Sequence, residues 1–365
     1  MRSTQHSKYR VLELLSPILG VIASLLVLLL IATAIGEKPG TTIAGIHKFT
    51  LANPTRLATI FSVAIPLFIS GLAVAIAFQA NVFNIGVEGQ YFIGGLVGAM
   101  AGIYLKLPVY LHLPVVVIAA MIGGALWAAI PALLKVRMGI HEVITTIMFN
   151  NIAAALVNFL VNGPLSGRGE KSLEPQTLKI QATALFGKLN HWFNALGLKI
   201  PKHVYLDYSL IVAIVMGFLV WFLLYRTRQG FEIRAIGTSM EVSHYAGVRV
   251  KRMQLTAFLA SGALGGLIGL QEIFAIRGVY TFEIASGLGF DGIAIALIGQ
   301  NSPVGVIFSS VLFAFLKQAG YGLQLYTRVP NAIIYIITGL MILFIVVTNE
   351  IATRYIRALR RKEAA

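Results

Sequence analysis

Long apolar runs separated by short polar segments dominate the pattern of this 365-residue chain. A helix needs about 17 to 25 apolar residues to cross the hydrocarbon core of a bilayer. Runs of about this length lie near residues 12–35, 57–79, 113–134, 142–161, 208–225, 254–275 and 331–349. Shorter or glycine-broken runs lie near residues 90–105, 288–299 and 303–320. The pattern predicts an all-α, polytopic integral membrane protein with about ten transmembrane helices in one domain over residues 1–365.

Composition supports this class and narrows the chemistry. Hydrophobic residues make up 57% of the chain and charged residues 12%, whereas soluble domains carry about 25% charged residues. The chain contains no cysteine, which excludes disulfides, thiolate metal sites and cysteine nucleophiles. The net charge of +15 arises mostly from basic residues at the ends of apolar runs. There, Lys and Arg set membrane topology and contact lipid headgroups, so nucleic-acid binding is not indicated.

The distribution of Lys and Arg predicts which ends of the runs face the cytoplasm. The N-terminus, the 135–141 turn, the 226–253 loop and the tail after Thr353 hold 16 of the 29 basic residues. Six of the other thirteen lie in the 163–206 loop, mostly far from the ends of runs, where the positive-inside rule gives them least weight. We therefore expect a multi-pass plasma-membrane protein with both termini inside.

Two segments outside the central runs have alternative interpretations. The first run has basic residues before it and Ala32-Thr33-Ala34 after it, as in a signal peptide, but its length favours a retained first span. In the outer loop, one helical face would carry Leu185, Phe186, Leu189, Trp192, Phe193 and Leu196. This predicts an amphipathic helix, which we expect to pack on the protein's own outer surface rather than to anchor in the membrane.

The glycine-rich stretch 287–299, GLGFDGIAIALIG, has the G-x-G-x-x-G spacing of dinucleotide-binding loops. That fingerprint requires a preceding strand and a soluble βαβ unit, which the pattern does not predict. His141 and Glu142 begin like a zinc-protease motif, but Thr145 stands where the second histidine would be. No phosphate-binding P-loop is present either. We expect no catalytic residues, no metal and no cofactor bound by this chain.

Two acidic residues lie between glycines at corresponding places in the two halves. They are Glu88 in Gly86-Val87-Glu88-Gly89 and Asp291 in Gly289-Phe290-Asp291-Gly292. Paired interrupted segments in inverted halves indicate the central site of a transporter. The pattern therefore predicts two short or broken helices in two inverted halves. Each acid could equally cap the helix that follows it, Glu88 before 90–105 and Asp291 at the start of 292–299.

Other polar residues lie at bilayer depth, where polar groups normally face a bundle interior or an aqueous pathway. We expect Asn84, Gln90 and Gln271 beside the solute path. Asn150 and Asn151 lie inside a predicted span, where such amides either contact solute or hold helices together. The 226–252 loop, rich in basic residues, suits either a headgroup contact or a small helix that docks on a cytoplasmic partner.

Four motifs carry a resemblance to a known family: FNIGVEGQ at 83–90, HEVITTIMFN at 141–150, QGFEIRAIG followed by YAGV at 229–248, and GFDGIAIALIG at 289–299. They resemble the permease subunits of bacterial ABC importers in the branched-chain amino acid and ribose permease superfamily, most closely the nucleoside branch. The resemblance covers nearly the whole chain after the first span. It implies a second related permease, a cytoplasmic ATPase that uses the ATP, and an external substrate-binding lipoprotein in a bacterial inner membrane.

The resemblance also assigns residues. The coupling helix would correspond to 230–247, with Gly230, Arg234, Gly237, Tyr245, Ala246 and Gly247. Thr238-Ser239-Met240 departs from the Asn and alanines expected there. The two glycine-flanked motifs would lie beside a midplane cavity that alternating access opens to each side. Because a nucleoside has a flat base, we expect the aromatic residues Phe83, Phe149 and Phe290 near its path.

Three alternative functions remain open from the sequence. A ribose or simple-sugar permease would keep the architecture without a base-stacking surface. An ion-coupled secondary transporter would use Glu88 and Asp291 as ion sites and would need no docking loop. A membrane enzyme is disfavoured because no constellation of acidic, His and Ser residues is visible.

Overall fold

The computed structural model describes residues 19–326, except 21, 24–25, 53, 168–173, 196, 198–199, 202–203 and 282–286, together with single residues and pairs between 336 and 358. In this part of the chain all regular structure is helical, and β-pairing is limited to isolated bridges between Gln176 and Thr281 and between Lys188 and Asp207. The all-α prediction is confirmed. Most of the run predicted at 331–349 and the start of the first run lie outside the described residues.

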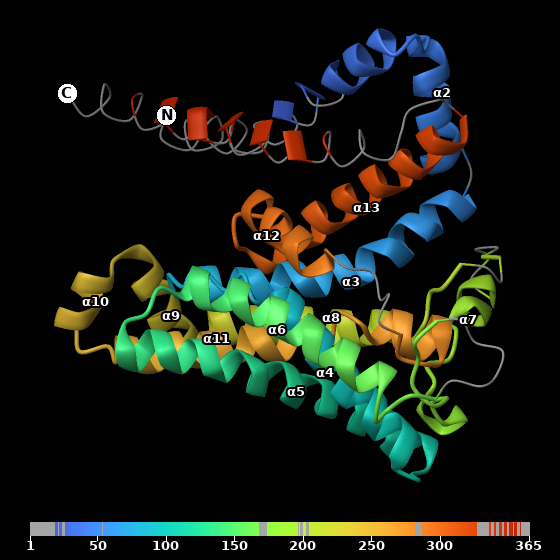
Figure 1. Cartoon of the computed structure of the whole chain (residues 1–365). Helices are drawn as coiled ribbons and strands as arrows, with labels where there is room; N and C mark the ends of the chain where they lie inside the picture. The colour runs from blue at the N-terminus through green and yellow to red at the C-terminus, as the bar shows by residue number, and fades with distance from the viewer. Residues whose placement is uncertain are drawn as a thin grey trace. The chain divides into compact units, whose positions relative to one another are not determined.

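The helices of the central part follow the predicted runs closely (Figure 1). They are α2 (Pro39–Thr50), α3 (Pro54–Gln79), α4 (Val87–Tyr104), α5 (Val109–Met138), α6 (Glu142–Asn162), α7 (Asn190–Ala195), α8 (Tyr208–Arg226), α9 (Arg228–Thr238), α10 (Met240–Tyr245), α11 (Val250–Gly265), α12 (Leu288–Ile298) and α13 (Pro303–Tyr326). Among the described residues, five helices are long and apolar enough to span a membrane: α3, α5, α6, α8 and α13. The total of ten crossings stays a prediction.

The run predicted as one span at 254–275 is divided in the structure. Helix α11 ends at Gly265, a turn covers 266–269, and a π-helical segment, η2, covers Gln271–Arg277. The glycines of this stretch weaken helix propagation because they lose more backbone entropy than other residues. The helix over this run is therefore not continuous, and the break places Gln271 at the start of a separate element, while the span itself stays a prediction.

Contacts divide the chain into two units, one with residues 58–314 and one with residues 1–57 and 315–365. In the larger unit, α4 and α11 both pack against α5, as Figure 1 shows for the neighbouring ribbons. Glycines line these interfaces: a Cβ atom on Gly266 would overlap the carbonyl oxygen of Ala120, and one on Gly124 would overlap that of Gly262. Such small residues allow membrane helices to approach backbone to backbone.

In the smaller unit, α2 packs against the C-terminal end of α13. The rings of Phe49 and Tyr326 meet edge to face with centroids 5.4 Å apart. The Lys48 ammonium lies 4.5 Å from the Tyr326 ring centroid, and the Arg56 guanidinium lies 4.4 Å from that of Phe49. Aromatic and cation–π contacts thus hold the end of this short helix.

The amphipathic helix predicted at 185–196 is mostly absent. Only Asn190–Ala195 is helical, and Leu196 is outside the described residues. The Phe186 N–H donates to the carbonyl of Phe274 (3.0 Å), and the Asn190 amide donates to the carbonyls of Pro201 (2.9 Å) and Val204 (3.0 Å). Residues 185–189 are not helical, and Phe186 is buried there, whereas Trp192 in the short helix is 64% exposed. The prediction of one amphipathic helix over 185–196, with a single apolar face, was therefore wrong.

The α5–α11 interface predicts the effect of adding one methyl group. Gly266→Ala should destabilise the fold by about 1–3 kcal/mol, because two backbones must move apart to admit the new Cβ. The thermal unfolding midpoint of the purified protein in detergent measures this. Gly40→Ala in α2 is the control, since a Cβ there meets nothing within 4 Å. Equal midpoints for the two variants would contradict the close packing.

Candidate functional site

The connection between α3 and α4 is held by a network of buried side-chain amides. The Asn84 Nδ2 group donates to Ser261 Oγ (2.8 Å) and to Gln90 Oε1 (2.9 Å). Its Oδ1 accepts from Gln90 Nε2 (2.9 Å) and from the Gly86 N–H (3.1 Å). Ser261 in turn donates to the carbonyl of Ala73 (2.5 Å). Asn84 and Gln90 are fully buried, so both amides serve to hold the backbone of the break.

Helix α6 holds the same break at two points. Asn150 Oδ1 accepts from the Gly89 N–H (2.8 Å), and its Nδ2 donates to the carbonyl of Ile85 (3.0 Å). At the first residue of the helix, Glu142 accepts from the Phe83 N–H (3.4 Å) and pairs with the Lys135 ammonium (2.7 Å). The side chain of Asn150 therefore binds helix elements together, which was one of its two predicted roles.

The two glycine-flanked motifs meet through Glu88. Its carboxylate, 3% exposed, accepts from the N–H of Gly287 (2.5 Å) with one oxygen and from that of Gly289 (2.7 Å) with the other. These are the first N–H groups of α12, where the helix dipole favours a negative charge. A Cβ on Gly289 would lie 2.5 Å from the Glu88 backbone nitrogen, so only glycine allows this approach. Segments about 200 residues apart thus join here.

Capping follows a different pattern from the one predicted. Helix α4 begins at Val87, so Glu88 lies inside its first turn and caps α12 instead of its own helix. Helix α12 begins at Leu288, after Gly287 with a φ of +94°, and Asp291 lies within its first turn. Neither acid occupies the N-cap position assigned to it from the sequence, because both helices begin earlier than the apolar runs indicated.

The remaining predicted path residues lie in different surroundings. Phe83 is 48% exposed and packs against Phe78, with ring centroids 5.0 Å apart. Phe290 is 47% exposed and follows the capped N-terminus of α12. Phe149 is partly buried and meets Trp127 edge to face at 5.4 Å. The three rings are not in contact with one another, so they form no single stacking platform in this state.

Gln271 belongs to a separate group at the start of α8. Its Nε2 donates to the carbonyl of Tyr205 (2.9 Å) and to Asp207 Oδ2 (3.2 Å). Asp207 also caps α8 by accepting from the Ser209 N–H (2.8 Å). Burial raises the pKa of the Asp207 carboxyl, although the bonds from Ser209 and Gln271 oppose the shift. Gln271 thus fastens the end of the 163–206 loop to the start of α8, and its described hydrogen bonds do not reach the two glycine-flanked breaks.

Helix α6 also has an exposed face that carries three amides. Asn151, Asn158 and Asn162 all point away from the described protein, and Ile144, Met148 and Phe159 lie on the same side. Asn162 donates to Asn158 Oδ1 (2.6 Å). Sequence reasoning named Asn151 but missed the other two. Their spacing of seven and four residues is the signal that would have found them.

The 226–253 segment forms two helices and a turn. Thr227 caps α9 by accepting from the Gly230 N–H (3.0 Å), and Arg234 donates to the carbonyl of Leu224 (3.0 Å). A Cβ on Gly230 would overlap the carbonyl oxygen of Leu223, and one on Gly237 would overlap that of Gln79. Helix α9 therefore packs against α8 and α3 through three of the residues that the resemblance assigns to the coupling helix: Gly230, Arg234 and Gly237.

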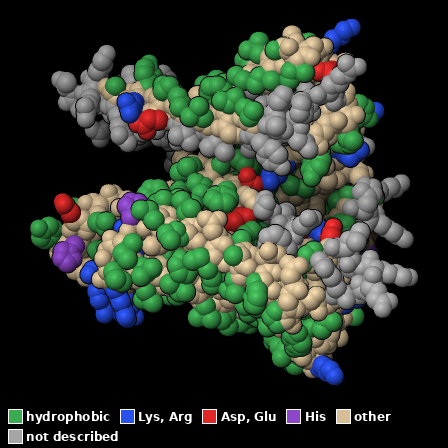
Figure 2. All heavy atoms as spheres, viewed as in Figure 1, with side chains coloured by type: hydrophobic (Ala, Val, Ile, Leu, Met, Phe, Trp, Pro, Cys, Tyr) green, Lys and Arg blue, Asp and Glu red, His purple; other side chains and the backbone are tan. Residues whose placement is uncertain are grey.

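The other residues that the resemblance assigns to the coupling helix lie in the exposed part of the 226–253 segment. In α10, Tyr245 is 89% exposed and Val242 is 67% exposed. Ala246 follows, and Gly247 turns the chain with a φ of +81°. Lys and Arg side chains gather at the end of the helical layer next to α10, whereas hydrophobic side chains cover much of α5 and α6 (Figure 2). This arrangement offers a short helix with a free apolar face and a basic surround.

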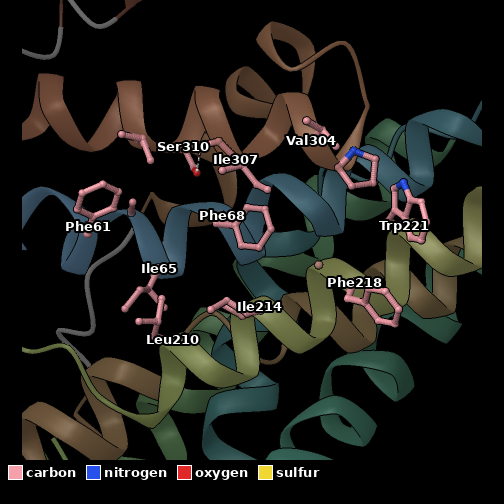
Figure 3. A pocket seen from close by; sticks show the side chains of 15 residues that line it. Phe61, Ile65, Phe68, Leu210, Ile214, Phe218, Trp221, Val304, Ile307 and Ser310 are labelled. Carbon is pink, nitrogen blue, oxygen red and sulfur yellow. Dashed lines mark hydrogen bonds between the residues drawn. The ribbon is translucent and has the colours of Figure 1, made fainter. Parts of the chain in front are cut away.

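Hollows at two places among the described residues differ in their lining. A groove of about 410 Å³ lies between α3, α8 and α13 and is lined by apolar residues (Figure 3). Among its lining side chains, only those of Ser310 and Trp221 carry a polar atom. It does not suit a polar solute, because hydroxyl groups would lose their hydrogen bonds there. An open hollow of about 910 Å³ surrounds α10 and the start of α11. Among the described residues there is no group of three or more His, Asp or Glu arranged to hold a metal.

Comparison with known proteins identifies the family to which this chain is similar. A family model described as the permease component of the branched-chain amino acid transport system matches residues 56–346. The guanosine ABC transporter permease protein NupP of Bacillus subtilis is 37% identical over 306 residues, which cover 82% of this chain and 83% of that protein. The glucose ABC transporter permease protein TsgB13 of Haloferax volcanii is 33% identical over 340 residues, which cover 93% and 88%.

The nucleoside ABC transporter permease protein NupB of Lactococcus lactis is 29% identical over 361 residues, which cover 96% of each chain. Two of these organisms contain a second similar protein with the same description. NupQ of Bacillus subtilis is 26% identical over 73% of this chain, and NupC of Lactococcus lactis is 26% identical over 68%.

The bonds of Glu88 predict a large effect of its removal on stability. Glu88→Ala leaves two N–H groups at the start of α12 without their acceptor, and the buried one, that of Gly289, should alone cost about 1–3 kcal/mol. Asp291→Ala removes a partly exposed acid from the same helix end and should cost about 0.3–1 kcal/mol. Thermal unfolding of both variants compares the two costs. An equal or larger loss for Asp291→Ala would contradict the capping role of Glu88.

Proposed function

This chain belongs to the family of permease components of branched-chain amino acid transport systems and is an ABC transporter permease, and we propose that it carries nucleosides. In this proposal it lies in a bacterial plasma membrane with both termini inside, and it imports its substrate by alternating access. It is a transport component and not an enzyme. A cytoplasmic ATPase would use the ATP, and an external binding protein would deliver the substrate.

The observation that carries the proposal is the amide face of α6. Asn151, Asn158 and Asn162 are exposed on a helix of 21 residues that is long and apolar enough to span the membrane. Lipid offers no hydrogen bonds, so an unpaired amide at that depth costs about 1–3 kcal/mol by protein mutational data. Asn162 donates to Asn158, so that pair is partly satisfied, but the remaining donors and acceptors of the three amides favour an aqueous path over lipid as the surroundings of this face.

An amide face also suits the chemistry of a nucleoside. Each amide both donates and accepts, so it can replace the water bonded to ribose hydroxyls and to the polar edge of a base. Exposed Phe83 and Phe290 offer ring faces for a base, although they are separate in this state. The relatives named for guanosine and nucleosides support this substrate class, and the relative named for glucose keeps sugars as the second candidate.

A second permease subunit fits both the relatives and the surface. In two organisms, the similar proteins occur as two permeases with one description. We propose that such a partner faces α6 across the solute path, so that the path is complete only in the pair. Site residues from one chain would then line half of the cavity.

The proposed ATPase contact is α10, with α9 as the connection to the membrane helices. The C-terminal end of α9 lies on the end of α3, where Gly237 packs on Gln79. Gln79 donates to the carbonyl of Asn301 (2.9 Å), in the turn that joins α12 to α13. Since α12 is also held by Glu88, movement of α10 can reach both glycine-flanked breaks through packed backbone. This is the route by which we expect ATP binding to change access to the cavity.

Uptake of labelled guanosine, uridine and ribose tests the substrate class. Cells that lack their own uptake systems receive this chain with its partner permease, binding protein and ATPase. We expect nucleoside uptake that disappears when the Walker lysine of the ATPase is replaced. Ribose uptake with the same dependence would transfer the proposal to sugars. Uptake by this chain alone, lost with the proton or sodium gradient, would refute the ATP-driven mechanism.

The α6 face predicts a specific defect in the same assay. Asn158→Leu should raise the KM for nucleoside about fivefold to tenfold, because one hydrogen bond contributes about 1–1.4 kcal/mol. Asn158 is exposed, so the variant should be produced at the normal level. Phe222→Leu, at an exposed position of α8 outside both the α6 face and the apolar groove, is the control and should leave KM unchanged. Unchanged KM in both variants would remove Asn158 from the path.

A further inference from the structure

The apolar groove between α3, α8 and α13 has no role in the proposed transport path. Phe61 and Phe68 line it from α3, Phe218 and Trp221 from α8, and Ile307 from α13 (Figure 3). Many of these side chains remain open to the surroundings: Phe61 is 53% exposed, Phe218 59% and Ile307 47%. A hollow of about 410 Å³ with such a lining is suited to a hydrocarbon ligand.

The dimensions of the groove match one leaflet of the bilayer. Its lining on α8 extends from Leu210 to Trp221, and eleven residues of α-helix rise about 16 Å. The hydrocarbon core of a bilayer is about 30 Å thick, so one leaflet is about half of that. In Figure 3, Phe61 and Leu210 lie at one end of the groove, and Trp221 and Val304 lie at the other. A single acyl chain would lie along this length.

One end of the groove carries a cation. The Arg226 guanidinium lies 5.6 Å from the centroid of the Trp221 ring, at the C-terminal end of α8. Arg226 is exposed and has no ion pair with the described residues. It also lies on the side of the membrane to which we assign the basic 226–253 loop. Trp and Arg at the end of a span are typical of the headgroup region, and basic sites there attract anionic lipids.

We propose that this groove is a binding site for an anionic phospholipid. One acyl chain lies between α3, α8 and α13, and the phosphate of the headgroup binds the Arg226 guanidinium. Arg226 is a donor suited to phosphate because its planar fork forms paired charge-assisted hydrogen bonds. The lipid covers apolar side chains that no described part of the chain covers, and it stabilises the arrangement of the three helices around it.

Native mass spectrometry of the assembled transporter tests this site. The protein is released from membranes that contain phosphatidylglycerol and phosphatidylcholine in equal amounts. One tightly retained phosphatidylglycerol per copy of this chain is expected. Arg226→Gln should lower its occupancy about fivefold, which corresponds to about 1 kcal/mol for one basic residue at an anionic surface. Arg137→Gln, at another exposed arginine assigned to the same side, is the control and should change nothing.

A second pair of variants tests the groove independently of the charge. Ile214→Trp adds bulk to an exposed lining position and should displace the lipid. Ile211→Trp adds the same bulk at a position of α8 that does not line the groove, and should retain it. Equal retention of both lipids in the wild type, unaffected by Arg226→Gln and Ile214→Trp, would overturn the proposal. Loss of the lipid from the free chain when the second permease is added would assign the groove to that partner and overturn it as well.

Discussion

The Glu88 carboxylate bound to the first N–H groups of α12 is the interaction on which the central part of the structure depends. A buried carboxylate is tolerated only where donors surround it, and the N-terminus of a helix supplies them in a fixed array. The approach needs glycine at 289, because any side chain there would collide with the backbone of Glu88. One acid and one glycine thereby fix where α4 and α12 meet.

The amides around this contact divide into two groups with different tasks. Asn84, Gln90 and Asn150 are buried, and their hydrogen-bonding groups are used by the protein itself. They hold the break between α3 and α4 in a shape that presents Glu88 to α12. The amides of the outward face of α6 are exposed instead, and Asn162 there donates to Asn158. In the proposed transport cycle, the rigid break would lie beside the solute path and keep the site fixed while access alternates.

The sequence predicted helices well where apolar runs were long and uninterrupted, as for α3, α5 and α6. It failed at 254–275 because four glycines within eight residues, at 262, 265, 266 and 269, allow a break that hydropathy alone does not detect. Motifs located Glu88 and Gln90 correctly as unusual residues. Their partners could not be predicted, since no spacing along the chain indicates that residue 88 meets residue 289. The partners of Gln271, which are Tyr205 and Asp207, could not be predicted for the same reason.

The cysteine-free chain allows a direct measurement of whether the α6 face lines the solute path. Asn151→Cys and Asn158→Cys each introduce one thiol, and a membrane-impermeant thiol reagent is applied to the assembled transporter with and without nucleoside. Both thiols should react, and saturating nucleoside should protect them. Phe222→Cys, exposed on α8 outside the apolar groove, should stay unreactive. Thiols at 151 and 158 as unreactive as the one at 222 would place this face in lipid or in a dry interface and contradict a solute path along α6.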